Sequence, residues 1–219
     1  MHKLWLSGVF FLSALLSGFA TASSAYGVHE DHPYEYSIKK DIYKLYEIYQ
    51  INSPRKDTYA GSVKKSPFRL RRTYDLSNQA GWQATGVIPI ISSGSLYNWA
   101  KDIDIYDTRG VKIGFIDGNL ATFEAAKFDF YEYDAAGNAL KIGTAYSNAQ
   151  FDRFVVFGAT NDPRPIAEIN RHLSEKTWTV TVHYPEMIDD RIIRIFSAFA
   201  IDYEDQFLKP TSCVNCTIL

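Results

Sequence analysis

Cysteine and strongly basic segments are scarce in this sequence. Its 219 residues include only two cysteines, so a framework of several disulfides is excluded. A chain of this length can bury the core of one substantial domain without such crosslinks. Lys and Arg total 23 against 25 Asp and Glu, a formal net charge of −2, and no segment is strongly basic. Nucleic acid is therefore not a predicted partner.

Familiar catalytic and cofactor motifs are also missing. The chain has no Gly-x-Ser-x-Gly elbow, no His-Glu-x-x-His pair and no phosphate-binding glycine loop. His172 and His183 could act as bases, but positions in a polar turn and at a strand rim explain both. The sequence therefore predicts no cofactor and no metal, and it favours a non-enzymatic protein. A carboxylate-based hydrolase is an alternative, although spacing selects no pair among Asp102, Asp104, Asp129, Glu132 and Glu168.

The N-terminus has the three regions of a secretory signal peptide. Lys3 supplies the positive charge, residues 4–16 are mostly apolar, and Ala20-Thr21-Ala22 fits the small-x-small cleavage pattern. The apolar run is too short to span a bilayer comfortably. We therefore expect residues 1–22 to be removed and the mature chain to be periplasmic or secreted. A buried first helix is the alternative.

Short segments with strand-like composition follow one another beyond residue 54. Aromatic residues make up 15% of the chain, and they favour pleated, half-buried surfaces. In the last segment Trp178, Val180 and Val182 alternate with threonines, as in a strand with one buried face. Many short strands at regular spacing predict a closed antiparallel barrel or a sandwich. The predicted strands are 59–64, 68–74, 82–91, 96–106, 111–116, 128–133, 139–145, 153–157, 166–169 and 177–184.

Two other segments carry specific local predictions. Ile38, Ile42, Leu45 and Ile48 recur at three- and four-residue spacing, which favours a helix beginning within residues 37–49. The end of that segment could equally be a strand. Asp117-Gly118-Asn119 predicts a turn after the strand at 111–116, because glycine supplies the positive φ that tight turns require.

One apolar segment near the C-terminus differs from the rest. Residues 192–201 are apolar nearly all round, interrupted only by Arg194 and Ser197. A helix of this kind must be enclosed on most sides. Since it has about half of the roughly 20 residues needed to cross a membrane, the enclosure should come from the protein itself. We predict a helix over about 189–206, wrapped by the strands; a buried strand is the alternative.

Two features resemble the superfamily of the tubby C-terminal domain, the phospholipid scramblases and the plant LURP-one-related proteins. Residues 103–115 and 128–140 look like that family's repeated units of strand, Asp-x-x-Gly turn and strand. The apolar helix ending in Ala200-Ile201-Asp202-Tyr203 is similar to the family's C-terminal core helix. The likeness covers about 45–207 and implies a roughly twelve-stranded barrel threaded by a helix. Function does not follow from it, because members include lipid binders and proteins without known activity.

These observations divide the chain into four parts. We expect the signal peptide at 1–22, a polar and partly helical segment at 23–43, the barrel domain at 44–208 and a tail at 209–219. The tail contains Cys213 and Cys216, which in an exported chain are candidates for a disulfide.

The functional prediction is an exported, non-enzymatic binding or structural module. Its partner would be a protein or an envelope component, bound through strand faces and loops. The alternative is a peripheral phospholipid binder at the membrane surface, with a low-specificity basic cluster of Lys64, Lys65, Arg69, Arg71 and Arg72. Aromatic residues could line a groove for sugar or lipid, although packing explains them as well; they are Trp82, Tyr97, Trp99, Tyr131 and Tyr133.

Overall fold

The computed structural model describes eight stretches of the chain: residues 34–43, 46–53, 58–66, 71–89, 102–122, 125–159, 164–172 and 177–208. The predictions for the signal peptide, for Tyr97 and Trp99, for Arg69 and for the cysteine pair lie outside the described residues.

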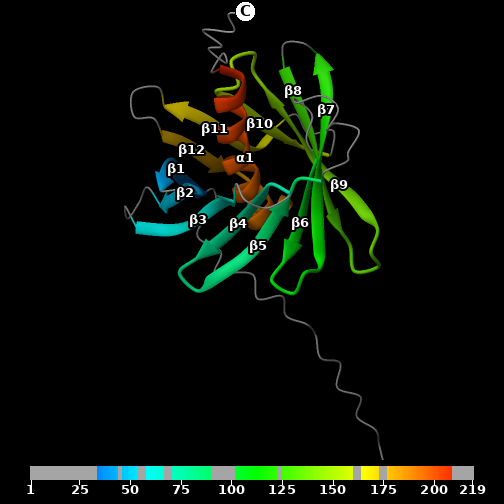
Figure 1. Ribbon diagram of the computed structural model, residues 1–219. Helices are drawn as coiled ribbons and strands as arrows, with labels where there is room; N and C mark the ends of the chain where they lie inside the picture. Colours follow the sequence, from blue (N-terminus) through cyan, green and yellow to red (C-terminus); the bar gives the residue numbers. More distant parts are fainter. Residues whose placement is uncertain are drawn as a thin grey trace, which may run out of the picture.

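Twelve antiparallel strands form a closed barrel (Figure 1). Each strand pairs with its neighbours in sequence, and β1 pairs with β12 to complete the ring. The strands are β1 (Tyr34–Tyr43), β2 (Tyr46–Ser53), β3 (Thr58–Ser66), β4 (Thr73–Asn78), β5 (Gly81–Val87), β6 (Ile103–Asp107), β7 (Lys112–Thr122), β8 (Ala125–Tyr133), β9 (Ala139–Ser147), β10 (Arg153–Gly158), β11 (Pro165–His172) and β12 (Thr177–Val182). Closure gives each described strand a hydrogen-bonded neighbour on both sides, although β7 extends beyond its pairing with β6.

Alternating side chains divide each strand between the barrel interior and its outer surface. In β12, Trp178, Val180 and Val182 are buried, and the threonines between them are partly exposed. Tyr34 of β1 lies opposite Val182, and Ala167 of β11 lies opposite the same residue on the other side. The predicted alternation in this segment is therefore confirmed, and it places one face of the closing strand in the core.

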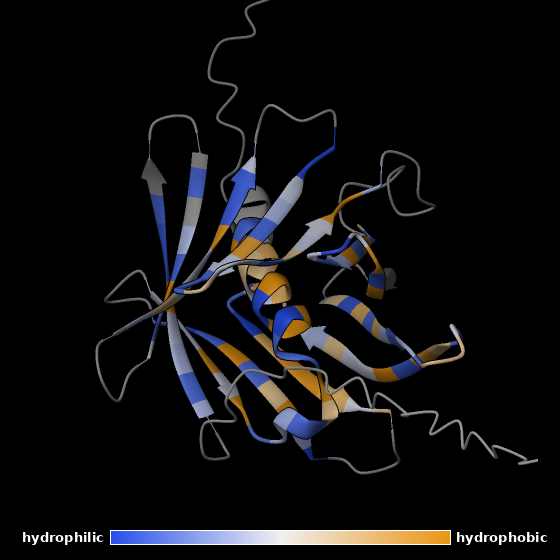
Figure 2. Ribbon diagram, turned by 90° about the horizontal axis from the view of Figure 1, so that it is seen from below, coloured by the Kyte–Doolittle hydropathy of each residue, from blue (hydrophilic) through white to orange (hydrophobic). Residues whose placement is uncertain are grey.

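The helix α1 (Asp190–Leu208) follows the short 3-10 helix η2 (Pro185–Met187) and lies inside the barrel. Figure 2 shows α1 surrounded by strands. Its side chains from Ile195 to Ala200 are at most 2% exposed. Phe196 has its ring centroid 5.3 Å from that of Phe128 and 4.8 Å from that of Phe130. The predicted barrel around a C-terminal helix is confirmed, because the strands supply the enclosure that an apolar helix requires.

Two glycines allow the barrel wall to approach the helix closely. A Cβ atom on Gly86 of β5 would lie 2.6 Å from Cγ2 of Ile195. A Cβ atom on Gly114 of β7 would lie 2.4 Å from the Tyr131 carbonyl oxygen and 2.9 Å from Cδ1 of Ile192. Any larger residue would therefore force the helix or the neighbouring strand to move.

The prediction of a helix beginning within residues 37–49 is wrong. These residues form the hairpin of β1 and β2, in which Ile38 lies opposite Ile51. Tyr36 and Ile38 face the core from β1, and Tyr49 and Ile51 face it from β2. The helical spacing arose because two strands, each with a period of two, were read as one segment. The barrel also includes β1, which precedes the expected boundary at residue 44.

The turn predicted at residues 117–119 is also wrong. β7 continues to Thr122, with Asp117 opposite Asp129 and Gly118 opposite Phe128. The Gly118 amide donates a hydrogen bond to Asp102 Oδ1 at 3.2 Å. Asp102 immediately precedes β6, so its side chain supplies an acceptor for β7 beyond the paired residues of β6. Of the strand predicted at 68–74, residues 68–70 lie outside the described residues and Arg71 and Arg72 precede the strand, since β4 runs from Thr73 to Asn78.

Candidate functional site

A cluster of charged and phenolic groups joins the C-terminal half of α1 to the barrel wall. We call it the Lys65 cluster: Lys40, Glu47, Tyr49, Lys65, Tyr74 and Asp202. Lys65 Nζ lies 2.6 Å from Asp202 Oδ1 and 2.8 Å from Glu47 Oε2. The Tyr74 hydroxyl donates to the second carboxylate oxygen of Asp202 at 2.9 Å. Buried charges are tolerated only when they are paired and hydrogen-bonded in this way.

Two further contacts of the Lys65 cluster lie on Glu47. Lys40 Nζ lies 3.4 Å from Glu47 Oε1, and the Tyr49 hydroxyl donates to Oε2 at 3.2 Å. Burial opposes ionisation of Glu47, but the hydrogen bond and charge of Lys65 outweigh it and lower the pKa of the carboxyl. Burial and then the charge of Asp202 raise the pKa values of Tyr49 and Tyr74. Glu47 is therefore ionised at neutral pH, and both tyrosines are neutral.

A second polar cluster anchors the first half of α1 to β1. Asp190 accepts a short hydrogen bond from the Tyr34 hydroxyl, and its other oxygen lies 2.7 Å from Arg194 Nε. The Arg194 guanidinium lies over the ring of Tyr36, 5.4 Å from its centroid, an arrangement that favours the cation. Arg194, the one charged residue within the apolar segment 192–201, thus contacts both the Asp190 carboxylate and the Tyr36 ring.

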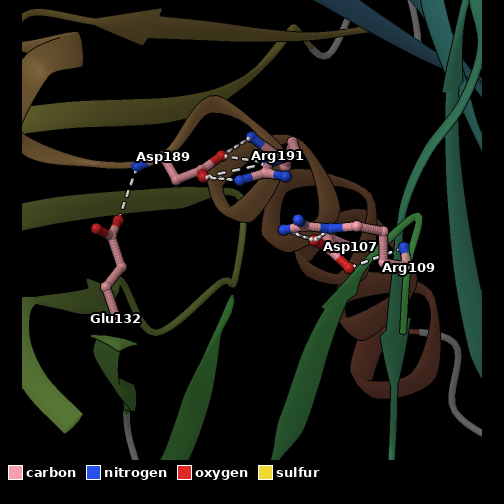
Figure 3. A network of polar contacts seen from close by, with 5 residues as sticks. All are labelled: Asp107, Arg109, Glu132, Asp189 and Arg191. Atoms are coloured by element: carbon pink, nitrogen blue, oxygen red, sulfur yellow. Dashed lines mark hydrogen bonds and ion pairs between the residues drawn. The ribbon is translucent and has the colours of Figure 1, made fainter. Parts of the chain in front are cut away.

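The N-terminus of α1 is held by a third set of contacts (Figure 3). The Asp189 amide donates to Glu132 Oε1 at 2.8 Å. The Asp189 carboxylate accepts the Arg191 amide at 2.8 Å and pairs with the Arg191 guanidinium, which satisfies donors in the first turn. Burial and then the Asp189 charge raise the pKa of Glu132.

Both Asp-x-x-Gly motifs build turns. Asp107 Oδ1 accepts hydrogen bonds from the amides of Arg109 and Val111, each at 2.9 Å. Its other oxygen, Oδ2, accepts a hydrogen bond from the Arg109 guanidinium (Figure 3). In the next unit Asp134 accepts the amide of Asn138 at 2.8 Å. Gly110 and Gly137 have φ values of 77° and 83°, which glycine adopts without strain. The motif residues therefore have a structural role in connecting strands.

The predicted basic cluster does not form one surface. Lys64 is exposed on the outer side of β3, whereas its neighbour Lys65 points inward to Asp202. Arg71 and Arg72 are exposed ahead of β4, and Arg69 lies outside the described residues. Successive residues of a strand point to opposite faces, and this separates the two lysines. Lys65 was predicted to bind an external anion, whereas the structure pairs it with the carboxylates of Glu47 and Asp202.

The candidate catalytic groups are occupied by other contacts. Asp104 pairs with Lys112 at 2.7 Å and Glu168 with Arg153 at 2.9 Å. His172 lies at the end of β11, with Nε2 2.7 Å from the Thr179 hydroxyl. His183 Nε2 lies 3.5 Å from Glu168 Oε1.

Asp129 has two basic neighbours and a hydroxyl donor. Lys141 Nζ lies 2.7 Å from its Oδ1, and the Thr144 hydroxyl donates to the same oxygen at 2.7 Å. Burial opposes ionisation, but these groups and Lys127 lower the pKa of Asp129. The carboxylate is therefore held in its charged form by Lys141 of the neighbouring β9 and by Lys127 of its own strand. No group of three or more potential metal ligands occurs within the described parts of the chain.

Aromatic side chains gather on the outer surface of β7 to β10. We call this surface the aromatic face: Phe115, Tyr131, Tyr133, Tyr146 and Phe157. The rings of Phe115 and Tyr131 stack with centroids 4.5 Å apart, and those of Tyr146 and Phe157 are 6.2 Å apart. Lys112 Nζ lies 4.9 Å from the Phe115 centroid. Outer strand positions facing water are usually polar, so this surface is unusual within the barrel.

Sequence reasoning found only part of the aromatic face. It named Tyr131 and Tyr133, whereas Phe115, Tyr146 and Phe157 were hidden in ordinary strand patterns. The signal for Phe115 was available, because it lies between Gly114 and Ile116, which both face inward. Trp82, also a candidate, is 46% exposed and belongs to the start of β5, where its indole donates to the Ala84 carbonyl at 3.0 Å.

Two comparisons with known proteins found no match. No family model matches the chain, and no curated protein matches it. As for membrane segments, the described part of the chain contains no helix long and apolar enough to cross a bilayer.

Proposed function

We propose that this chain is an exported, non-enzymatic binding or structural module that contacts another protein or an envelope component through its outer surface. The observation that carries this proposal is the filling of the barrel by α1. In a barrel that holds a small ligand, the interior is left open to receive it. Here Phe196 and Phe199 of α1 contact Phe128 from the wall, so the space is used by the protein's own core.

The aromatic face is the part of the outer surface best suited to such contact. Tyr146 is 44% exposed. Aromatic residues contribute large contact areas at low cost in side-chain entropy, and they are enriched in protein interfaces. Asp129–Lys141 lies between the Phe115–Tyr131 pair and the Tyr146–Phe157 pair, because Asp129 is opposite Thr144 and Lys141 is opposite Tyr131. Together with Asp104–Lys112 it would add polar contacts.

Export and membership of the tubby-like superfamily belong to the same proposal. The twelve strands, the enclosed C-terminal helix and the two Asp-x-x-Gly turns are what the family likeness led us to expect. Export is supported by the charged, apolar and small-residue regions of the first 22 residues.

Site-specific photocrosslinking in the producing cell tests the proposed surface. A photoreactive phenylalanine analogue is placed at Tyr146, and the matched control carries it at Tyr59 of β3. The two tyrosines are 44% and 43% exposed, so general accessibility is the same. We expect one discrete crosslinked species from position 146 and none from position 59. Equal crosslinking from both positions, or none from either, would contradict the proposed surface.

A further inference from the structure

We propose that Lys65 and Asp202 become joined by an intramolecular isopeptide bond, which ties β3 to α1 covalently. This inference does not depend on the proposed binding function. It assigns a covalent modification to two side chains that the sequence did not connect. Lys65 was predicted to bind an anion at the surface, and Asp202 was part of the end of the predicted helix.

The amine and the carboxyl group that would react are already in contact and largely shielded from water. Lys65 Nζ lies 2.6 Å from Asp202 Oδ1, and the two side chains are 13% and 4% exposed. Reacting groups held at such a distance undergo an effectively unimolecular reaction, for which high effective concentrations are typical. Val63 and Leu76 on the adjacent strands are buried, so the pair lies next to an apolar core.

Glu47 and Tyr74 are placed to assist the reaction. Glu47 Oε2 lies 2.8 Å from Lys65 Nζ, so this carboxylate can accept a proton from the ammonium and leave a neutral amine. The Tyr74 hydroxyl donates to Asp202 Oδ2 at 2.9 Å. A donor at that oxygen stabilises the negative charge that develops when the amine adds to the carboxyl carbon.

The reaction is a condensation that needs no oxidant and no co-reactant. The nitrogen lone pair of Lys65 attacks Cγ of Asp202 and forms the new C–N bond. The bond from Cγ to Oδ1 breaks, and its electron pair leaves with that oxygen. Two of the three ammonium protons leave with Oδ1 as water, one of them relayed by Glu47, and the third stays on the amide nitrogen. Glu47 ends in the state in which it began.

Burial of the charges favours the product. Before the reaction two opposite charges are held away from water, which carries a desolvation cost even when they are paired. The amide is neutral, and the remaining charges of Glu47 and Lys40 still face each other at 3.4 Å. The bond would join residues 137 positions apart and would close most of the barrel into one covalent loop.

Intact mass spectrometry of the wild-type mature protein, denatured and reduced, tests the proposal directly. We expect a mass lower by one water molecule than the value calculated from the observed N-terminus, and a branched tryptic peptide that contains both residues. The control is the neighbouring exposed lysine: Lys64→Arg should keep the water loss, whereas Lys65→Arg should abolish it.

An unmodified wild-type mass is decisive without any variant, and when water is lost the branched peptide of the wild type locates the bond, so the result does not depend on whether a variant folds. An unmodified mass would overturn the proposal and leave an ionic contact. A water loss that survives in Lys65→Arg would overturn it as well, because it would place the dehydration elsewhere, for example in a succinimide. Slower appearance of the water loss in Glu47→Gln during refolding would support the proton-transfer role of Glu47.

Discussion

Replacement of Phe196 by alanine should be among the most destabilising single changes in this protein. Its ring is fully buried on α1 and lies within 4.8 to 6.1 Å, centroid to centroid, of Phe128, Phe130, Phe154 and Phe199. Removal of a buried phenylalanine side chain costs about 3–5 kcal/mol when the site cannot collapse. The four rings come from β8, β10 and the helix itself, so movement of one of them cannot fill the space that all four surround.

The assay is reversible urea unfolding of purified Phe196→Ala, followed by circular dichroism. For a domain of this size each kcal/mol corresponds to a melting temperature change of about 2–4 °C. We therefore expect a decrease of roughly 6–20 °C in a parallel thermal scan. The matched control is Phe115→Ala, which removes the same side chain from the outer surface of β7.

The comparison between the two variants decides whether the helix is the centre of the core. Phe115 stacks on Tyr131 but is partly exposed, so its loss should cost about 1 kcal/mol. If Phe196→Ala destabilised the protein no more than Phe115→Ala, α1 would not be the packing centre and the enclosed-helix architecture would be refuted.

Three further changes test other parts of the structure. Gly114→Ala should destabilise the barrel by about 1–3 kcal/mol, because the new methyl group meets the Tyr131 carbonyl and Ile192. Gly110→Ala, where nothing lies within 4 Å but φ is 77°, should lose stability through backbone strain alone, and urea unfolding compares the two. Asp107→Ala should lower the free energy of unfolding by about 1–3 kcal/mol, because two turn amides lose their acceptor. The control Asp117→Ala removes a carboxylate that lies opposite Asp129 and should be neutral or slightly stabilising. Equal losses of stability in the two variants would contradict the role of Asp107 in the turn. The pKa of the Glu132 carboxyl is raised in the folded protein. Its contribution to stability is therefore present at pH values below the unfolded pKa of about 4.5 and is lost as pH rises through the folded pKa. Glu132→Gln should flatten the pH dependence of the melting temperature above pH 4.5, and an unchanged profile would argue against this linkage.

Local patterns in the sequence were sufficient for the class of fold. The alternation of Trp178, Val180 and Val182 and the apolar run at 192–201 each reflect burial that is set by the period of one element. A run that is apolar on all sides can be satisfied only by enclosure, so a barrel around a helix followed from the chain itself. The Asp-x-x-Gly turns were equally local, because each aspartate bonds to amides two and four residues ahead.

Predictions failed where two elements met. Ile38 and Ile48 seemed to share a helical face because the sequence does not mark the hairpin between β1 and β2. Gly118 resembled a turn residue, but the pairing of β7 with β8 extends the strand through it. In both places the deciding contacts come from a neighbouring strand, and no local spacing contains that information.

The sequence by itself determined that most of the chain beyond residue 54 forms strands, that one helix must be enclosed, and where two of the turns fall, because each of these depends on neighbours within a few residues. Only the tertiary structure decided that Lys65 faces Asp202, 137 residues away, while Lys64 faces solvent, and that five aromatic rings from four strands share one outer surface. These arrangements depend on strand register and on closure of the barrel, which bring together residues distant in the chain.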